Sequence, residues 1–264
     1  RLISEAGFTA VRVPVRWSAH AEADSPYTID KSFRDRIDWV IYQSLINDLA
    51  VVINIHHYEE LFVHPEQHRE RFLALWRQIA GHCLSQPDDL IFEVLNEPHD
   101  ALSASLWNDY LIEAITAIRS IDPDRTLMIG TAEWGGVGSL QKLIIPDSLQ
   151  NIIVTVHYYN PFHFTHQGAE WVSGSEEWLG TTWRGYTAGK KAMTDELDLV
   201  AAWATQHNRP MFVGEFGAYN KSDMTSRAAW TRTLRTEAEE RNMSWGYWEF
   251  CAGFGIYDLN TNEW

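Results

Sequence analysis

The 264-residue sequence has few of the features that mark several other classes of protein. Its two cysteines, Cys83 and Cys251, form no Cys-x-x-Cys pair, so neither a disulfide scaffold nor a cysteine zinc site is expected. Basic residues are scarce, because 21 Lys and Arg face 36 Asp and Glu and the net charge is −15. This balance argues against a nucleic-acid partner, since phosphate binding needs clustered cations. No run of 18 apolar residues occurs, so no membrane-spanning helix is expected.

The sequence patterns of nucleotide and metal enzymes are absent as well. No Gly-x-Gly-x-x-Gly or Walker pattern occurs, and no Gly-x-Ser-x-Gly elbow of the usual serine hydrolases. His56 and His57 are adjacent at a strand end and should point to opposite faces. His163 and His166 follow Pro161 and could chelate an ion together only within a helix. We therefore expect no catalytic metal and no other cofactor.

Aromatic residues, in contrast, are abundant, with 13 Trp, 10 Tyr and 11 Phe. They can fill a core, or they can line a groove for flat ligands such as sugar rings. The longest irregular stretch, residues 158–190, contains several glycines together with Trp171, Trp178, Trp183 and Tyr186. A long loop in a compact domain is usually functional, so this stretch is either a substrate lid or a surface flap packed by its own rings.

Short apolar segments alternate with amphipathic helical segments along the chain. Apolar side chains recur at helical spacing in residues 72–79, 107–118 and 193–204, and again at Trp230 and Leu234. This alternation predicts an α/β fold with a parallel sheet covered by helices. A (β/α)8 TIM barrel is the closed form expected at this length, with an open doubly wound sheet as the alternative. The predicted strands are residues 9–15, 50–55, 90–95, 126–129, 152–157, 211–214 and 244–248.

We expect residues 1–264 to form a single catalytic barrel domain, because no linker-like or low-complexity segment interrupts them. The first seven residues resemble the end of a helix with Gly7 as its cap. The sequence stops at Trp264, soon after the seventh predicted strand. The first strand and the last helix of the barrel are therefore expected to be absent from this sequence.

Polar and aromatic side chains follow the predicted strands at the end where a barrel carries its chemistry. Glu97 and Glu215 stand out, because two carboxylates from separate strands are what glycoside hydrolysis requires. One protonates the leaving oxygen, and the other attacks the anomeric carbon or activates water. Either could instead belong to a structural salt bridge. The remaining side chains at strand ends are Arg12, Pro14, His56, His57, Asn96, Trp134, His157, Tyr159 and Trp248.

Glu93 lies in the same predicted strand as Glu97. Side chains alternate along a strand, so Glu93, Leu95 and Glu97 are expected on one face. A strand buried on both faces places Glu93 in the interior, where an ionised carboxylate needs a partner. The sequence leaves that partner open.

These segments resemble glycoside hydrolase family 5 of clan A. The likeness rests on six motifs in the order of the family, spread over nearly the whole chain: residues 11–17, 53–58, 95–98 (Leu-Asn-Glu-Pro), 156–159, 214–217 (Gly-Glu-Phe-Gly) and 245–250. Residues 129–136 and 164–171 are similar to a bacterial group of thermostable endoglucanases that also act on mannan.

The resemblance implies a (β/α)8 barrel and a retaining mechanism, with Glu97 as acid/base and Glu215 as nucleophile. It implies that Asn96 hydrogen-bonds the sugar 2-hydroxyl, that Arg12 keeps Glu215 ionised and that Tyr159 orients Glu215. The other implied site residues bind sugar or line the cleft. They are His157 near the acid/base, His56 and His57 on the non-reducing side, Trp248 as a stacking platform, and His166, Trp171 and Phe254 along the cleft.

We therefore predict a retaining endo-β-1,4-glycanase that acts on glucan, with mannan as a second substrate. The alternative is a non-catalytic carbohydrate-binding protein on a decayed barrel, which Glu97 and Glu215 argue against and the missing first strand keeps open. A metal-dependent barrel hydrolase is a third reading. We expect a monomer whose partner is a polysaccharide or oligosaccharide, with no nucleic acid and no membrane, and the resemblance implies secretion.

Overall fold

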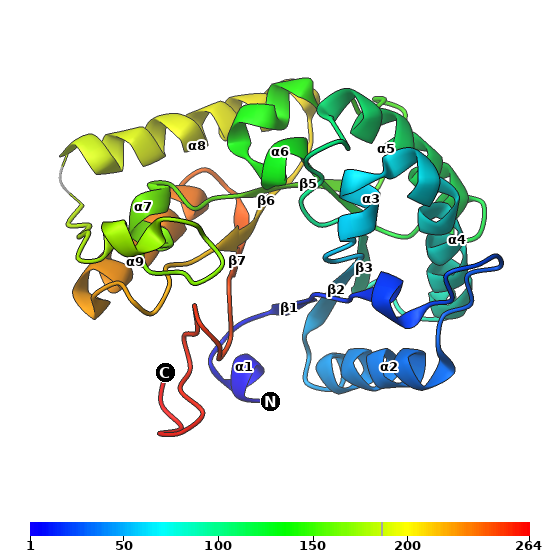
Figure 1. Cartoon of the computed structure of the whole chain (residues 1–264), viewed down its shortest axis with the longest axis horizontal. Coiled ribbons are helices and arrows are strands. Elements are labelled where there is room, and N and C mark those ends of the chain that lie inside the picture. The colour runs from blue at the N-terminus through cyan, green and yellow to red at the C-terminus, as the bar shows by residue number, and fades with distance from the viewer. Residues whose placement is uncertain (186) are drawn as a thin grey trace. The chain divides into compact units, whose positions relative to one another are not determined.

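The computed structural model describes residues 1–185 and 187–264, so Tyr186 lies outside the described residues (Figure 1). The chain divides into two compact units, Arg1–Val154 and Thr155–Trp264, and the boundary falls inside the strand β5 (Ile152–His157). The expectation of a single domain over residues 1–264 stays a prediction.

The first unit contains four parallel strands that pair in chain order. Val11 lies opposite Val51, Val52 opposite Ile91, and Phe92 opposite Leu127. Central strands of this kind are buried on both faces, which explains the near-continuous apolar runs seen in the sequence. The strands are β1 (Ala10–Val13), β2 (Ala50–Asn54), β3 (Leu90–Glu93) and β4 (Leu127–Gly130).

Helices of the first unit lie along these strands, and α4 (Pro65–Cys83) and α5 (Ala104–Arg119) run side by side (Figure 1). Each anchors a buried tryptophan to a strand end, because the indole N–H of Trp76 donates to the Val94 carbonyl and that of Trp107 to the Gly130 carbonyl, both at 2.9 Å. The other helical segments are α1 (Leu2–Glu5), η1 (Trp17–His20), α2 (Lys31–Leu45), α3 (Glu59–Val63), α6 (Ala132–Gly135) and η2 (Val137–Lys142).

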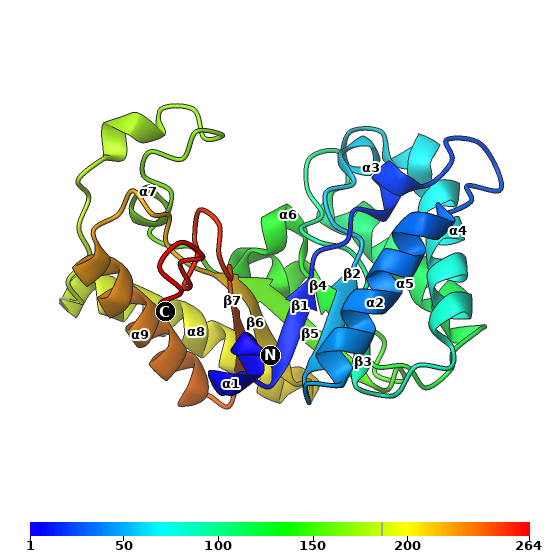
Figure 2. The same cartoon turned by 90° about the horizontal axis from the view of Figure 1, so that it is seen from below.

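The second unit contains the end of β5, together with β6 (Met211–Phe216) and β7 (Ser244–Tyr247). The strands β6 and β7 are parallel, with Phe212 opposite Ser244. Figure 2 shows α8 (Thr187–His207) and α9 (Met224–Glu239) side by side, and α8 contacts β6 while α9 contacts β7. Two short helices, α7 (Phe162–Thr165) and η3 (Ser175–Trp178), lie in the stretch predicted to be irregular.

The seven predicted strands and the alternating helices are confirmed, which establishes the α/β class. Gly7 follows α1 with a φ of +90°, as expected of a glycine cap. The irregular stretch, residues 158–190, contains both a buried ring, Trp183, and an exposed ring, Trp171. Within the described ranges, every helix is too short or too polar to cross a membrane.

Candidate active site

In the first unit, Arg12 forms a buried ion pair with Glu93. The guanidinium of Arg12, from β1, donates through Nε to Glu93 Oε2 at 2.5 Å and through Nη2 to Oε1 at 2.8 Å. Glu93 is 1% exposed, so its charge needs such a two-point partner. Arg12 is therefore a partner for the buried carboxylate that the sequence left unmatched. The predicted action of Arg12 on Glu215 stays a prediction.

Asn96 and His56 are held by the same polar group. Arg12 Nη2 also donates to Asn96 Oδ1 at 2.7 Å. Asn54 donates from Nδ2 to His56 Nδ1 at 3.1 Å and lies 3.4 Å from Glu93 Oε2. Since Nδ1 accepts this hydrogen bond, the proton of a neutral His56 is on Nε2. The arrangement fixes the orientation of two predicted sugar-binding side chains.

His57 differs from its neighbour. Its side chain is largely exposed and its Nδ1 lies 3.5 Å from Glu59 Oε1, whereas His56 is buried. The two rings meet edge to face, with centroids 4.3 Å apart. This agrees with the expectation that the adjacent histidines point in different directions.

Glu97 has an unusual backbone conformation. Its φ is +45°, a value that non-glycine residues adopt rarely and that is often found at functional sites. The strand β3 ends at Glu93, so strand alternation does not extend to Glu97. The expectation that Glu93, Leu95 and Glu97 share one strand face is therefore wrong, because Leu95 and Glu97 both lie beyond the strand.

The loop after β4 presents an exposed indole. Trp134 is 55% exposed, and both Trp134 and Glu133 have a positive φ. Glu133 is held by Ser139 Oγ and Lys142 Nζ, each at 2.5 Å, and these hydrogen bonds lower the pKa of the Glu133 carboxyl. The ring of His99 stacks on Trp134 with centroids 4.9 Å apart and planes 14° apart. Sequence reasoning identified Trp134 as a strand-end residue and missed His99.

In the second unit, Glu215 is a buried carboxylate near the end of β6. It is 5% exposed, and its Oε2 accepts a hydrogen bond from the Tyr159 hydroxyl at 3.0 Å. His157 Nδ1 lies 3.7 Å from the same oxygen. The predicted orienting contact from Tyr159 is thus present in the geometry.

Two glycines bracket Glu215 at places of close approach. A Cβ atom added to Gly214 would lie 2.3 Å from Thr155 Oγ1, and one added to Gly217 would lie 2.1 Å from the Trp248 carbonyl oxygen. Neither distance is compatible with a side chain. The absence of a Cβ at both positions therefore lets β6 run close to its neighbours on either side of the carboxylate.

Aromatic rings surround His166. Its imidazole stacks on Phe162 at 4.0 Å between centroids, and its Nδ1 lies 3.0 Å from Thr165 Oγ1. Burial lowers the pKa of His166 to about 4, so the ring is neutral near pH 7. Phe254 lies 5.3 Å from His166 and 5.9 Å from Tyr159, between ring centroids.

Trp171 is exposed but fixed at its edge. Its ring meets Tyr219 edge to face at 4.9 Å, and the Tyr219 hydroxyl donates to Glu170 Oε2 at 2.6 Å. Trp248 follows β7, is joined to Glu249 by a cis peptide bond and packs against the cluster of Ala169, Tyr219 and Phe254.

The Glu249 carboxylate organises the loop after β7. It accepts hydrogen bonds from the backbone N–H groups of Ala252 at 2.9 Å and Phe254 at 3.1 Å. Glu249 therefore sets the path that carries Phe254 to the rings around His166. Sequence reasoning placed Glu249 within a motif but gave it no role, because the signal lies in the loop path.

The structure thus assembles the predicted residues in two groups, one in each unit. The first unit brings together Arg12, Asn96 and His56, with His57 turned outward. The second unit brings Glu215 into contact with His157 and Tyr159. Around them lie His166, Trp171, Trp248 and Phe254.

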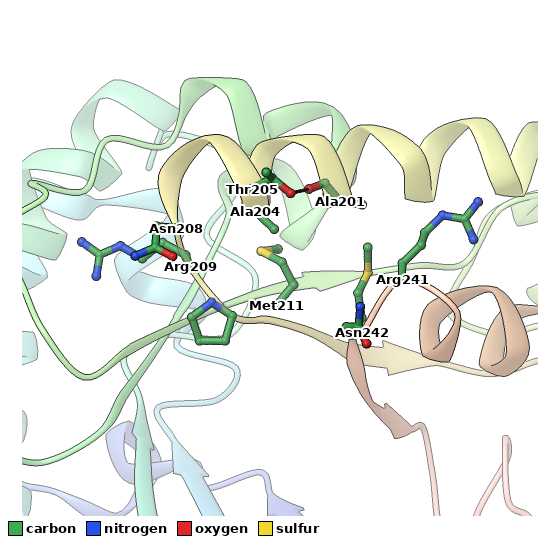
Figure 3. A pocket seen from close by; sticks show the side chains of 10 residues that line it. Ala201, Ala204, Thr205, Asn208, Arg209, Met211, Arg241 and Asn242 are labelled. Atoms are coloured by element: carbon green, nitrogen blue, oxygen red, sulfur yellow. Dashed lines mark hydrogen bonds between the residues drawn. The ribbon is translucent and has the colours of Figure 1, made fainter.

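A cavity of about 330 Å³ lies elsewhere in the second unit (Figure 3). It is lined by the end of α8, by Met211 at the start of β6, and by Arg241 and Asn242 after α9. Glu215 is at the other end of β6, where a parallel barrel sheet carries its chemistry. The cavity contains none of the predicted site residues.

Comparison with known proteins gives concordant matches. The family model Cellulase (glycosyl hydrolase family 5) matches residues 1–253. Endoglucanase H of Acetivibrio thermocellus is 33% identical over 244 residues, which cover 92% of this chain and 26% of that protein. The chain therefore spans about a quarter of the length of this relative.

Two solved structures are similar over the whole chain. The Thermotoga maritima Cel5A structure in complex with cellobiose is 54% identical, with a TM-score of 0.98, and the match covers 100% of this chain and 85% of that one. The Cel5A structure in complex with mannotriose is 53% identical, with the same TM-score and coverage. Similarity of this extent confirms the predicted (β/α)8 TIM-barrel fold.

Proposed function

The chain belongs to the cellulase family, glycosyl hydrolase family 5, and from this premise we propose that it is a retaining endo-β-1,4-glycanase. β-1,4-Glucan is the main substrate and β-1,4-mannan the second. The observation that carries the proposal is Glu215, a buried carboxylate that accepts a hydrogen bond from Tyr159. A single catalytic domain over residues 1–264 and action as a monomer are part of the proposal.

Glu215 is the nucleophile of the proposed reaction. A hydroxyl that donates to a carboxylate favours its ionised form and fixes one of its oxygens. The tyrosine contact therefore prepares Glu215 to attack the anomeric carbon. The bond from Glu215 to this carbon forms while the bond to the leaving oxygen breaks, and the product is a glycosyl-enzyme ester.

Glu97 is the acid/base. It gives its proton to the leaving oxygen in the first step, and in the second step it takes a proton from the water that opens the ester. A retaining pair of carboxyl groups lies about 5–5.5 Å apart. The positive φ of Glu97 is the type of backbone outlier that accompanies such positioning.

Asn96 binds the sugar 2-hydroxyl in this proposal. Its Oδ1 accepts from Arg12, so its Nδ2 is the group that donates to substrate. Glucose and mannose differ at this carbon alone. A single amide donor at that position is consistent with use of both polymers, and the relative Cel5A has been solved with both cellobiose and mannotriose.

Aromatic side chains and histidines bind the other sugar units of the polysaccharide. Trp134 stacks a sugar of the leaving group, because its exposed ring belongs to a loop that contacts the Glu97 segment through Trp134 N and the Pro98 carbonyl. The other proposed sugar-binding residues are His56, His57, His157, His166, Trp171, Trp248 and Phe254. Polymers of this size do not enter cells, so we propose that the protein acts outside the cell.

The first test is a pair of initial rates, on carboxymethyl-cellulose and on a soluble mannan, for the parent protein and for Glu97→Gln. We expect reducing ends from the glucan at the higher rate, and a loss of roughly 100- to 10,000-fold in the variant, because it cannot donate the proton. The product anomer is followed by NMR during the first turnovers on cellopentaose.

Two results would contradict the proposal. Release of the α-anomer as first product would indicate inversion instead of retention. Binding of cellopentaose without release of reducing ends from either polymer would support a carbohydrate-binding protein.

A further inference from the structure

His99 joins two parts of the proposed site in the first unit. Its Nδ1 lies 2.5 Å from the backbone carbonyl oxygen of Glu97, and its ring stacks on the indole of Trp134. The imidazole also contacts buried Phe62, with centroids 4.1 Å apart and planes 43° apart. The ring thus contacts a core residue as well as an exposed platform.

The hydrogen bond defines the protonation of Nδ1. A carbonyl oxygen can only accept, so His99 Nδ1 carries the proton and donates it to Glu97 O. The Nε2 atom faces two carboxylates, Glu59 at 3.8 Å and Asp100 at 3.9 Å. The hydrogen bond to the Glu97 carbonyl therefore orients the imidazole ring.

The two segments that His99 joins are both held in rare backbone conformations. Glu97 and Trp134 have φ values of +45° and +58°. Such conformations persist only where surrounding contacts over-determine them. The Nδ1 hydrogen bond supplies one such contact at the carbonyl of Glu97, and the stacked ring supplies one beneath Trp134.

We propose that His99 is a positioning residue with two separable actions. Its N–H fixes the backbone of the acid/base Glu97, and its ring face supports Trp134 as the platform for the leaving sugar. The proposal rests on the proposed function of Glu97 and Trp134. It assigns His99 no contact with the reacting atoms.

Two substitutions divide these actions. His99→Phe keeps a flat ring against Phe62 and Trp134 and removes the hydrogen-bond donor. His99→Asn places an amide N–H near the position of Nδ1 and removes the stacking face. Each variant is the matched control for the other.

Two substrates distinguish effects on the leaving group from effects on the rest of the site. Cellopentaose needs both protonation of the leaving oxygen and a bound leaving sugar. Dinitrophenyl cellobioside has a leaving group that departs without a proton and is not a sugar. Its first step, read as kcat/KM, therefore needs neither a proton from Glu97 nor a sugar bound on Trp134.

We expect His99→Phe to lower kcat on cellopentaose by roughly ten- to a hundred-fold with little change in KM, because the acid is misplaced. We expect His99→Asn to raise KM on cellopentaose about five-fold with little change in kcat, because the platform loses its support. On dinitrophenyl cellobioside, kcat/KM of both variants should stay within about two-fold of the parent.

Equal losses on both substrates in both variants would overturn the proposal, since they would indicate a structural role alone. Unchanged kinetics in both would overturn it as well. A parent protein that is inactive on both substrates would instead refute the proposed function.

If either variant fails to fold, the platform is tested from its other side. Trp134→Ala should raise KM on cellopentaose by the same factor as the loss of the stacking face. In the Trp134→Ala background the oligosaccharide KM should respond no further to His99→Gln, which keeps a polar donor and lacks the ring. A further rise in KM in that background would contradict the support role.

Discussion

The two units hold their candidate site residues by different physical means. In the first unit, charge fixes the arrangement, because Arg12 donates to both oxygens of Glu93 and to Asn96 in the interior. In the second unit, the described contacts of Glu215 include Tyr159 and His157, and the Tyr159 ring continues into the cluster around His166 and Phe254. The ion pair fixes the positions of Arg12, Glu93 and Asn96 in the first unit. In the second unit, the Tyr159 hydroxyl favours the ionised form of the Glu215 carboxylate.

This difference has an energetic meaning. Removing one member of a buried ion pair leaves an unpaired charge, which costs more than the pair contributes when whole. Removing a hydroxyl from a ring costs one hydrogen bond. Substitution of one member of the Arg12–Glu93 pair should therefore reduce stability, and substitution of Tyr159 should reduce activity.

The largest expected effect is a loss of catalytic activity in the second unit. Glu215→Ala removes the nucleophile and should lower kcat by roughly 10,000-fold or more while cellopentaose still binds. The loss is measured as reducing ends from carboxymethyl-cellulose, and binding is measured by calorimetry. Glu240→Ala, an exposed carboxylate in the same unit, is the control and should leave the rate unchanged. More than a trace of activity in Glu215→Ala would refute the nucleophile assignment.

The next effect is on stability. Arg12→Met leaves Glu93 ionised and buried, so it should lower the free energy of unfolding by about 3–5 kcal/mol. Adding Glu93→Leu removes the stranded charge and should restore most of that loss. Urea unfolding of the parent, both single variants and the double variant measures the effect. If Arg12→Met lowers the free energy of unfolding by less than about 1 kcal/mol, the Arg12–Glu93 pair contributes no more than a weak surface salt bridge.

A third effect concerns pH in the second unit. The pKa of His166 is lowered by burial to about 4, below the value near 6.5 of an unfolded chain. The unfolded state therefore binds a proton first as the pH falls, so stability is lost between about pH 6.5 and pH 4 and levels off below. The loss should approach roughly 3 kcal/mol.

His166→Gln supplies the control for this pH effect, because it cannot titrate. Its free energy of unfolding should fall less than that of the parent between pH 7 and pH 4.5, when both are measured by urea unfolding. Parallel pH profiles of the two proteins would show that His166 keeps an ordinary pKa.

The smallest expected effect is again a loss of catalytic activity in the second unit. Tyr159→Phe removes the hydroxyl that donates to Glu215 and should lower kcat by roughly ten- to a hundred-fold. Its free energy of unfolding should change by about 1 kcal/mol. Tyr42→Phe, an exposed tyrosine on α2, should change neither quantity. A large stability loss in Tyr159→Phe would erase the contrast between the two groups.

Much of the fold could be predicted from the sequence because the strands β2 to β6 are largely buried on both faces. The apolar runs begin or end within a few residues of the observed strands, as with β2 and β5. The helix α2 was not predicted. It buries Ile37 and Ile41 but exposes Trp39 and Tyr42, which blurs the apolar periodicity on which such a prediction depends.

Candidate site residues could be proposed where residue type and a strand end coincide, as at Arg12 and Glu215. Glu97 lies four residues beyond the end of β3, and its role stays a prediction. The need of Glu93 for a partner followed from burial, but the identity of Arg12 as that partner required the register between strands. His99 and Glu249 were missed because their contacts depend on loop paths. Backbone conformations such as those of Glu97 and Trp134 leave no mark in residue type alone.

The close approach at Gly214 and Gly217 has a consequence for how this protein can be altered. A single-base change in the first or second position of a glycine codon introduces a side chain or ends the chain. At these two positions any side chain meets Thr155 or the backbone of Trp248. Random mutagenesis should therefore recover almost no active clone with a change at Gly214 or Gly217. A library aimed at new substrates should instead diversify exposed positions such as Trp134 and Trp171.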